Sequence, residues 1–114
     1  MPSYRVTVEI REVRPGVAPE DVLPTAERVL AGTHQVEDRR LDVVSRPAGL
    51  QPRVQLRFVV PATGATAEDA EAEAAARALV DDLGEVARCG RWELRRGPGR
   101  HWRLRASGSC VSEH

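Results

Sequence analysis

The sequence predicts a single α+β domain whose elements follow the order βαββαβ, with one further strand at the C-terminal end. Three observations lead to this prediction. Residues 4–11 and 53–60 alternate between apolar and polar side chains, as half-buried strands do. Residues 22–31 and 66–86 instead repeat their apolar side chains at helical spacing. Near the end, a Trp-x-Leu pattern on each side of the glycine- and proline-containing segment 97–99 indicates a hairpin.

The first half of the chain holds the first strand, the first helix and the second strand. A turn at residues 15–16 ends the first strand. The helix is predicted to begin at residue 19 or 22, with Asp21 as its cap, and to end at Gly32. Residues 36–46 indicate a second strand, and we expect the segment 47–52, which contains two prolines and a glycine, to be a loop.

The second half begins with a clear strand at 53–60 and continues with the longest helix. Thr66 and Asp69 resemble a capping box at the start of this helix. In the final hairpin we expect Trp92 to lie opposite Leu104, because this register places all the apolar side chains on one face. Residues 1–106 are thus predicted to form one domain, and residues 107–114 a disordered tail.

The element order resembles the split βαβ pattern of the ferredoxin-like superfold over residues 3–106. This resemblance implies an antiparallel sheet of strand order 4-1-3-2, with two helices on one face and the extra strand beside strand 4. The superfold hosts many unrelated functions, so it assigns none by itself. The sheet face away from the helices is expected to be polar and rich in arginine, with Arg5, Thr7, Glu9, Arg11, Arg53, Gln55, Arg57, Val59, Arg91, Glu93 and Arg95.

The composition is that of a folded globular domain, with 114 residues, 41% hydrophobic residues, 30% charged residues and no net charge. All of the basic residues are arginine, which is typical of a bacterial protein from a high-GC genome. Cys89 and Cys110 match no zinc or redox spacing, and no apolar run approaches the length of a membrane span. The sequence therefore predicts a cytoplasmic protein with reduced thiols and no membrane partner.

Charge is distributed unevenly, since residues 65–87 carry a net charge of −6 and residues 88–114 a net charge of +5. Four basic side chains of the final hairpin are expected to project together from one side, those of Arg91, Arg95, Arg103 and Arg105, while Arg96 and Arg100 flank the turn. An anion or a nucleic-acid backbone could bind there. The alternatives are an edge strand protected by charge, or a hairpin that contacts the acidic helix of a second copy. The candidate anion-binding residues are Arg91, Arg95, Arg96, Arg100, Arg103 and Arg105.

No pattern of catalytic, cofactor-binding or metal-binding residues emerges from the sequence. His34, His101 and His114 are far apart in the chain, and we expect them to be incidental surface residues. Base stacking on the sheet, as in RNA-binding domains of this shape, is disfavoured because Tyr4 and Phe58 are expected to face the helices. The chain also contains no asparagine, which an acylphosphatase pair of Arg and Asn requires.

The leading functional hypothesis is therefore a small non-enzymatic binding or protein-interaction module, whose partner is an unknown protein or a second copy of the chain. The alternative is a sequence-independent nucleic-acid or phosphate binder that uses the hairpin arginines. A small-molecule-binding regulatory domain or an enzyme is the third hypothesis.

Overall fold

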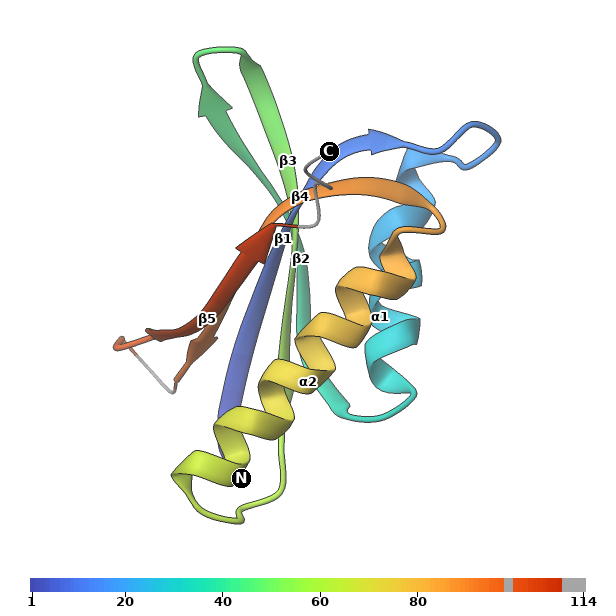
Figure 1. Cartoon of the computed structure of the whole chain (residues 1–114). Helices are drawn as coiled ribbons and strands as arrows, with labels where there is room; N and C mark the ends of the chain where they lie inside the picture. The colour runs from blue at the N-terminus through green and yellow to red at the C-terminus, as the bar shows by residue number, and fades with distance from the viewer. Residues whose placement is uncertain (98–99, 110–114) are drawn as a thin grey trace.

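The computed structural model describes residues 1–97 and 100–109, which form an α+β structure with one antiparallel sheet. Both α-helices cover the same face of this sheet and leave the other face open (Figure 1). The elements in chain order are β1 (Ser3–Val13), a short 3-10 helix (Pro19–Asp21), α1 (Val22–Ala31), β2 (Gln35–Arg46), β3 (Gly49–Val59), α2 (Ala65–Leu83), β4 (Ala87–Arg96) and β5 (Arg103–Ser109).

The strands are arranged in the order β2-β3-β1-β4-β5. β1 pairs with β3 on one side and with β4 on the other, and β5 extends the sheet beyond β4. These neighbour relations are the ones that the sequence predicts. Because residues directly opposite each other on paired strands point to the same face, Arg5, Arg57 and Arg95 become neighbours on the open face.

The hydrophobic core lies between the sheet and the two helices. The seven residues expected there are all buried, none with more than 3% of its surface exposed. Three of the seven buried residues of α2 are alanines, whose small side chains let the helix backbone pack close to the sheet. In the described part of the chain, no helix combines the length and the apolar character needed to cross a membrane. The seven predicted core residues are Tyr4, Val8, Leu56, Phe58, Leu79, Leu83 and Trp92.

The connection between β2 and β3 is shorter than the sequence predicts. β3 begins at Gly49, so the expected loop at 47–52 is confirmed for residues 47–48 and wrong for residues 49–52, and Pro52 lies within the strand opposite Val43. β1 pairs with β3 only as far as Arg53, so Pro52 lies where β3 has a single neighbouring strand. A proline, which lacks an N–H donor, is tolerated at such a position. The resulting β2–β3 hairpin projects beyond the helices (Figure 1).

The register of the final hairpin also differs from the prediction. Trp92 lies opposite Gly108, and not opposite Leu104. The indole ring fills the space above this glycine, where a Cβ atom would lie 2.7 Å from Trp92 Nε1. β5 continues to Ser109, so the tail expected from residue 107 is wrong for residues 107–109, and residues 110–114 lie outside the described part.

The start of α2 is capped differently from the predicted Thr66–Asp69 box. The N-cap residue is Gly64, whose φ of 107° lies in the region that favours glycine. The Glu68 carboxylate accepts hydrogen bonds from the backbone N–H groups of Thr63 and Gly64, at 2.9 and 3.0 Å. The side chain of Glu68 thereby fixes the loop that leads into the helix.

Candidate anion-binding face

The open face of the sheet carries more positive than negative charge in the described part of the chain. A row of three arginines crosses its centre: Arg57 on β3, Arg5 on β1 and Arg95 on β4. Including this row, the described part of the face holds at least eight arginines and five acids. The arginines are Arg5, Arg11, Arg40, Arg46, Arg53, Arg57, Arg91 and Arg95, and the acids are Glu9, Glu37, Asp38, Asp42 and Glu93.

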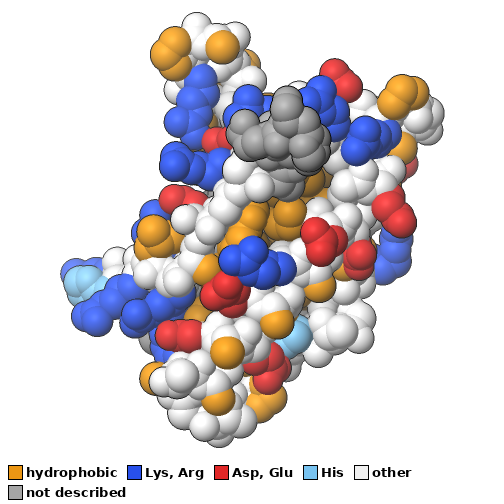
Figure 2. All heavy atoms as spheres, in the orientation of Figure 1, with side chains coloured by type: hydrophobic (Ala, Val, Ile, Leu, Met, Phe, Trp, Pro, Cys, Tyr) orange, Lys and Arg blue, Asp and Glu red, His pale blue; other side chains and the backbone are white. Residues whose placement is uncertain are grey.

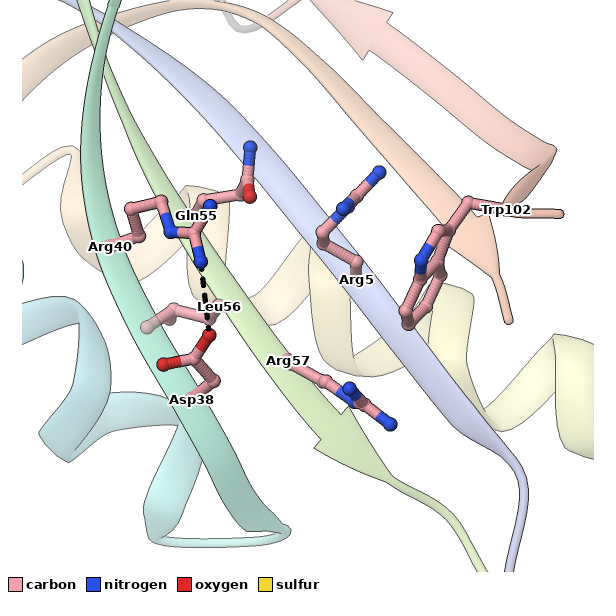
Figure 3. A pocket seen from close by; sticks show the side chains of 7 residues that line it. All are labelled: Arg5, Asp38, Arg40, Gln55, Leu56, Arg57 and Trp102. Atoms are coloured by element: carbon pink, nitrogen blue, oxygen red, sulfur yellow. Dashed lines mark ion pairs between the residues drawn. The ribbon is translucent and has the colours of Figure 1, made fainter. Parts of the chain in front are cut away.

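A hollow of about 130 Å³ lies beside the central row. Arg5, Arg40, Arg57 and Trp102 contribute to its lining, and Trp102 reaches it from the loop between β4 and β5 (Figure 3). The guanidinium carbons of Arg5 and Arg57 lie 4.7 and 5.4 Å from the centre of the indole ring. Cation–π attraction at these distances holds both guanidinium groups beside the ring.

Arg5 differs from Arg40, Arg53, Arg57 and Arg95 in having no ion-pair partner among the described residues. Its guanidinium forms no ion pair or hydrogen bond with any described residue, although it is partly buried. The pKa of Arg5 is lowered, first by burial and then by repulsion from Arg95, Arg40, Arg53 and Arg57. The positive charge at the centre of the face is therefore not neutralised by the protein itself.

The neighbouring arginines are partly neutralised. Arg53 pairs with Asp42, and this hydrogen bond is the main cause of the lowered pKa of Asp42. Arg46 lies 2.8 Å from Glu9. Other ion pairs join Arg95 to Glu93 at 3.4 Å, Arg40 to Asp38 at 3.8 Å and Arg57 to Glu37 at 3.2 Å.

Two buried donor atoms on this face also have no hydrogen-bond partner in the described structure. These atoms are Nε of Arg53 and Nε of Arg57. The Arg57 atom lies 3.2 Å from Glu37 Oε1, but the angles are not those of a hydrogen bond. Buried polar atoms normally form a hydrogen bond, so these two N–H groups are available to donate one to a bound anion or water molecule.

The six hairpin arginines predicted as one site are divided between the two faces of the sheet. Arg91 and Arg95 lie on the open face, whereas Arg96 and Arg105 reach α2 on the helix side. A register shift between Leu94 and Arg95 breaks the simple alternation along β5 on which the prediction relied. The expectation that these side chains project together is therefore wrong.

The remaining two predicted residues, Arg100 and Arg103, are exposed and lie at the hairpin loop and at the first position of β5. Figure 2 shows basic side chains gathered at this hairpin tip, at the lower left of the view. Neither residue has an ion pair within the described part of the chain. They remain candidates for anion contacts at the edge of the face.

Arg96 is instead the centre of a polar network under α2. It donates hydrogen bonds to Glu68 at 2.7 Å, to Asp69 at 3.0 Å and to the Tyr4 hydroxyl at 2.7 Å. The Tyr4 hydroxyl in turn donates a hydrogen bond to Asp69, and Arg105 lies 3.7 Å from the same carboxyl group. The proposed contact between the basic hairpin and an acidic helix thus occurs within one chain.

Within this network Tyr4 and Arg96 hold their protons more tightly, whereas Glu68 and Asp69 are stabilised as carboxylates. Burial, and then the hydrogen bond to Asp69, raise the pKa of Tyr4. The hydrogen bond to Glu68 is the main cause of the raised pKa of Arg96, and the same bond lowers the pKa of Glu68. Since Tyr4 is made harder to ionise and every member has a partner, the arrangement stabilises the fold and offers no activated nucleophile.

His34 was expected at the surface, but its side chain is only 11% exposed. The ring lies 2.9 Å from Glu71 Oε2 and meets Phe58 edge-on, so it ties the loop before β2 to α2. Cys89 is buried, whereas Cys110 and His114 lie outside the described residues. Within the described ranges, no group of three or more His, Cys, Asp or Glu side chains is placed to hold a metal ion.

Comparison with known proteins identifies a similarity of fold. No protein-family model matches the sequence, and no curated protein matches it. Among solved structures, the chain is similar to a phage SAM lyase in its apo state, with a TM-score of 0.52 and 15% sequence identity. The similarity covers 98% of this chain and 90% of the lyase, so it extends over the whole architecture.

Proposed function

We propose that this protein is a non-enzymatic binding module that holds a polyanion on the open face of its sheet. The observation that supports this proposal is the partly buried Arg5 guanidinium, which has no carboxylate partner among the described residues and is surrounded by other arginines. An anion bound there would offset the repulsion that lowers its pKa. Arginine suits this task because its planar fork of donors matches the oxygens of a phosphate.

The polyanion that we propose is a nucleic acid, contacted through its phosphates and without sequence preference. Arg57, Arg5 and Arg95 lie on three adjacent strands, which are spaced about 4.8 Å apart, so the row presents several donors to successive phosphates. Trp102 adds an aromatic surface beside the row. The site thus differs from the hairpin cluster that the sequence indicated.

The fold assignment forms part of the same proposal. We infer that β1 to β4 with the two helices form a ferredoxin-like split βαβ unit, and that β5 is an addition to its edge. The order of the strands and the position of both helices on one face support this inference. The activity of the phage SAM lyase is not transferred to this chain, because a likeness at 15% identity concerns the fold alone.

A binding titration in which salt is varied tests the function. A labelled single-stranded oligonucleotide should bind at about 20 mM salt and dissociate as salt increases, because phosphate contacts release counterions. Replacing Arg5 by Gln should weaken binding and reduce the slope of log K against log salt by about 0.7, the value for one lost single-strand contact.

The matched control is Arg28→Gln, which removes the same charge from an exposed position on α1, on the opposite side of the sheet. Its affinity and salt slope should equal those of the unmodified protein. Absence of binding at low salt would contradict the proposed function. Binding that Arg5→Gln and Arg28→Gln affect equally would show that the open face is not the site.

A further inference from the structure

We propose that two copies of the chain pair through the outer edges of their β2 strands and join their sheets into one. β2 is an edge strand of 12 residues, and no strand in the described part of the chain pairs with its outer side. An edge of this length presents a row of backbone donors and acceptors that another strand can satisfy. This inference is independent of the proposed nucleic-acid binding.

The helix-facing side of β2 exposes apolar surface next to that edge. Leu41 and Val43 are 57% and 51% exposed, although both point to the face on which the core lies. Leu41 also lines an apolar groove of about 430 Å³, which includes Ile10, Val13, Val22, Leu23 and Val54. Figure 2 shows further hydrophobic side chains at the tip of the projecting β2–β3 hairpin. Apolar surface of this kind marks a site of association.

The charges along β2 restrict the registers in which a second copy of the strand can pair with it. In a symmetric antiparallel pair, the residue on the twofold axis lies opposite its own copy, and its neighbours pair across it. An axis at Arg39, Arg40 or Asp42 places like charges directly opposite each other. An axis at Val43 places Arg40 opposite Arg46. Like charges in such positions are destabilising.

An axis at Leu41 avoids these conflicts and pairs residues 36–46, whereas an axis at Val44, which also avoids them, pairs only residues 42–46 of the strand. Leu41 then meets Leu41 of the second copy on the helix side, and Arg40 lies opposite Asp42 of the second copy on the open side. Because the relation is symmetric, two such ion pairs form. A second copy of this chain is therefore the partner whose charges and apolar residues fit the edge.

The pairs across the axis would extend an alternation of charge that exists within each copy. Asp42 is already paired with Arg53 on β3. Arg40, which lies 3.8 Å from Asp38, has a side chain that is 66% exposed and available to a second carboxylate (Figure 3). In the dimer, Asp42 of each copy would lie between Arg53 of its own β3 strand and Arg40 of the second copy.

The dimer would also align the two open faces, because a twofold axis perpendicular to the sheet keeps both helical layers on one side. The arginine rows of both copies would then belong to a single surface. A ligand long enough to span the junction would contact both rows, and its second contact would benefit from a high effective concentration.

Sedimentation equilibrium of the full chain without nucleic acid tests the inference. The unmodified protein should sediment at twice the monomer mass at micromolar concentration. Leu41→Asp should convert it to a monomer, because two carboxylates would then meet at the axis. The control, Leu50→Asp, makes the same change at an exposed position on β3, 76% exposed, and should remain a dimer. Both positions are exposed, so neither change should disturb folding.

Cross-linking tests the register. In a protein in which Cys89 is replaced by Ala and Cys110 by Ser, Leu41→Cys should form a disulfide between copies, because directly opposite residues are about 4.5–5.5 Å apart at Cα. Val43→Cys would lie opposite Arg39 of the second copy, four positions from its own counterpart along that strand, and should cross-link far less. A monomeric unmodified protein, or equal cross-linking at both positions, would overturn the proposal.

Discussion

The Arg96 guanidinium donates a 2.7 Å hydrogen bond to the Tyr4 hydroxyl, and this contact joins the two neighbouring strands β1 and β4 to the first turns of α2 through Asp69. Both side chains reach the helix side of the sheet, and Arg96 also lies with its guanidinium carbon 5.4 Å from the centre of the Tyr4 ring. The pair therefore combines hydrogen bonding with a cation–π contact at the edge of the hydrophobic core.

Removal of the Tyr4 hydroxyl should cost little, whereas removal of the Arg96 charge should cost more. Tyr4→Phe loses its hydrogen bonds but leaves Arg96 in direct contact with Asp69, so we expect the free energy of unfolding to fall by about 1 kcal/mol. Arg96→Met leaves Glu68 without its cation and Asp69 with only Arg105, and should destabilise the protein more than Tyr4→Phe does. Urea denaturation of both variants measures the difference, and equal effects would contradict the central role of Arg96.

The same network predicts how stability depends on acid pH. The hydrogen bond from Arg96 is the main cause of the lowered pKa of Glu68. For Asp69, burial acts to raise the pKa, but the hydrogen bonds from Tyr4 and Arg96 outweigh it and the pKa is lowered. A carboxyl group whose pKa is lowered by folding stabilises the native state above its unfolded pKa of about 4. This stabilisation is lost as the pH falls through the lowered native value.

The free energy of unfolding should therefore decrease as the pH falls from about 5 to 2. Arg96→Met should flatten this dependence, because it removes the main cause of the lowered pKa of Glu68 and one of the hydrogen bonds that lower the pKa of Asp69. Arg28→Gln, on the exposed surface of α1, should keep the full dependence. Denaturation curves measured across this range decide the matter, and a slope in Arg96→Met as steep as in the unmodified protein would exclude this network as its source.

The register of the final hairpin can be tested at Gly108. Because a Cβ atom there would lie 2.7 Å from Trp92 Nε1, we expect Gly108→Ala to destabilise the protein by about 1–3 kcal/mol, as overpacking does. Ser107→Ala, at an exposed position of the same strand, should change stability by less than about 0.5 kcal/mol. If both substitutions are equally tolerated, Trp92 does not lie over Gly108.

The sequence predicted the strands, the helices, their neighbours and the core, because these depend on strong periodic patterns such as that of Tyr4, Val6 and Val8. The prediction failed for the final hairpin, where the same apolar pattern is compatible with two strand registers. Pairing apolar residues placed Trp92 opposite Leu104, but the volume of the indole ring requires the small Gly108. The alternation of apolar and polar residues carries no information about such shape complementarity between side chains.

The candidate site was predicted in part for the same reason. Alternation along β1 and β3 correctly assigned Arg5 and Arg57 to the open face. The predicted hairpin register placed Trp102 on the same face as Trp92, whereas its ring lies over Arg5 on the open face, and Arg96 was expected at a turn rather than under α2. Which arginines are neutralised depends on contacts between distant residues, such as the 2.7 Å ion pair of Arg96 with Glu68, and periodicity carries no information about these.

Trp102 provides a test that separates the position of the arginines from their charge. Its indole ring lies beside the guanidinium groups of Arg5 and Arg57, and packs so closely against Gly97 that a Cβ there would lie 2.6 Å from the ring. Trp102→Leu should leave both arginines charged but less well held. We expect the affinity for a single-stranded oligonucleotide to fall several-fold, since a cation–π contact contributes about 0.5–1 kcal/mol at an exposed site. The salt slope should not change, because no phosphate contact is lost.

Arg5→Gln should lower both the affinity and the salt slope, so comparison of the two titrations distinguishes a positioning residue from a contacting one. A reduced salt slope in Trp102→Leu would mean that the ring is needed to keep an arginine in contact with phosphate, and an unchanged affinity would mean that it has no part in binding.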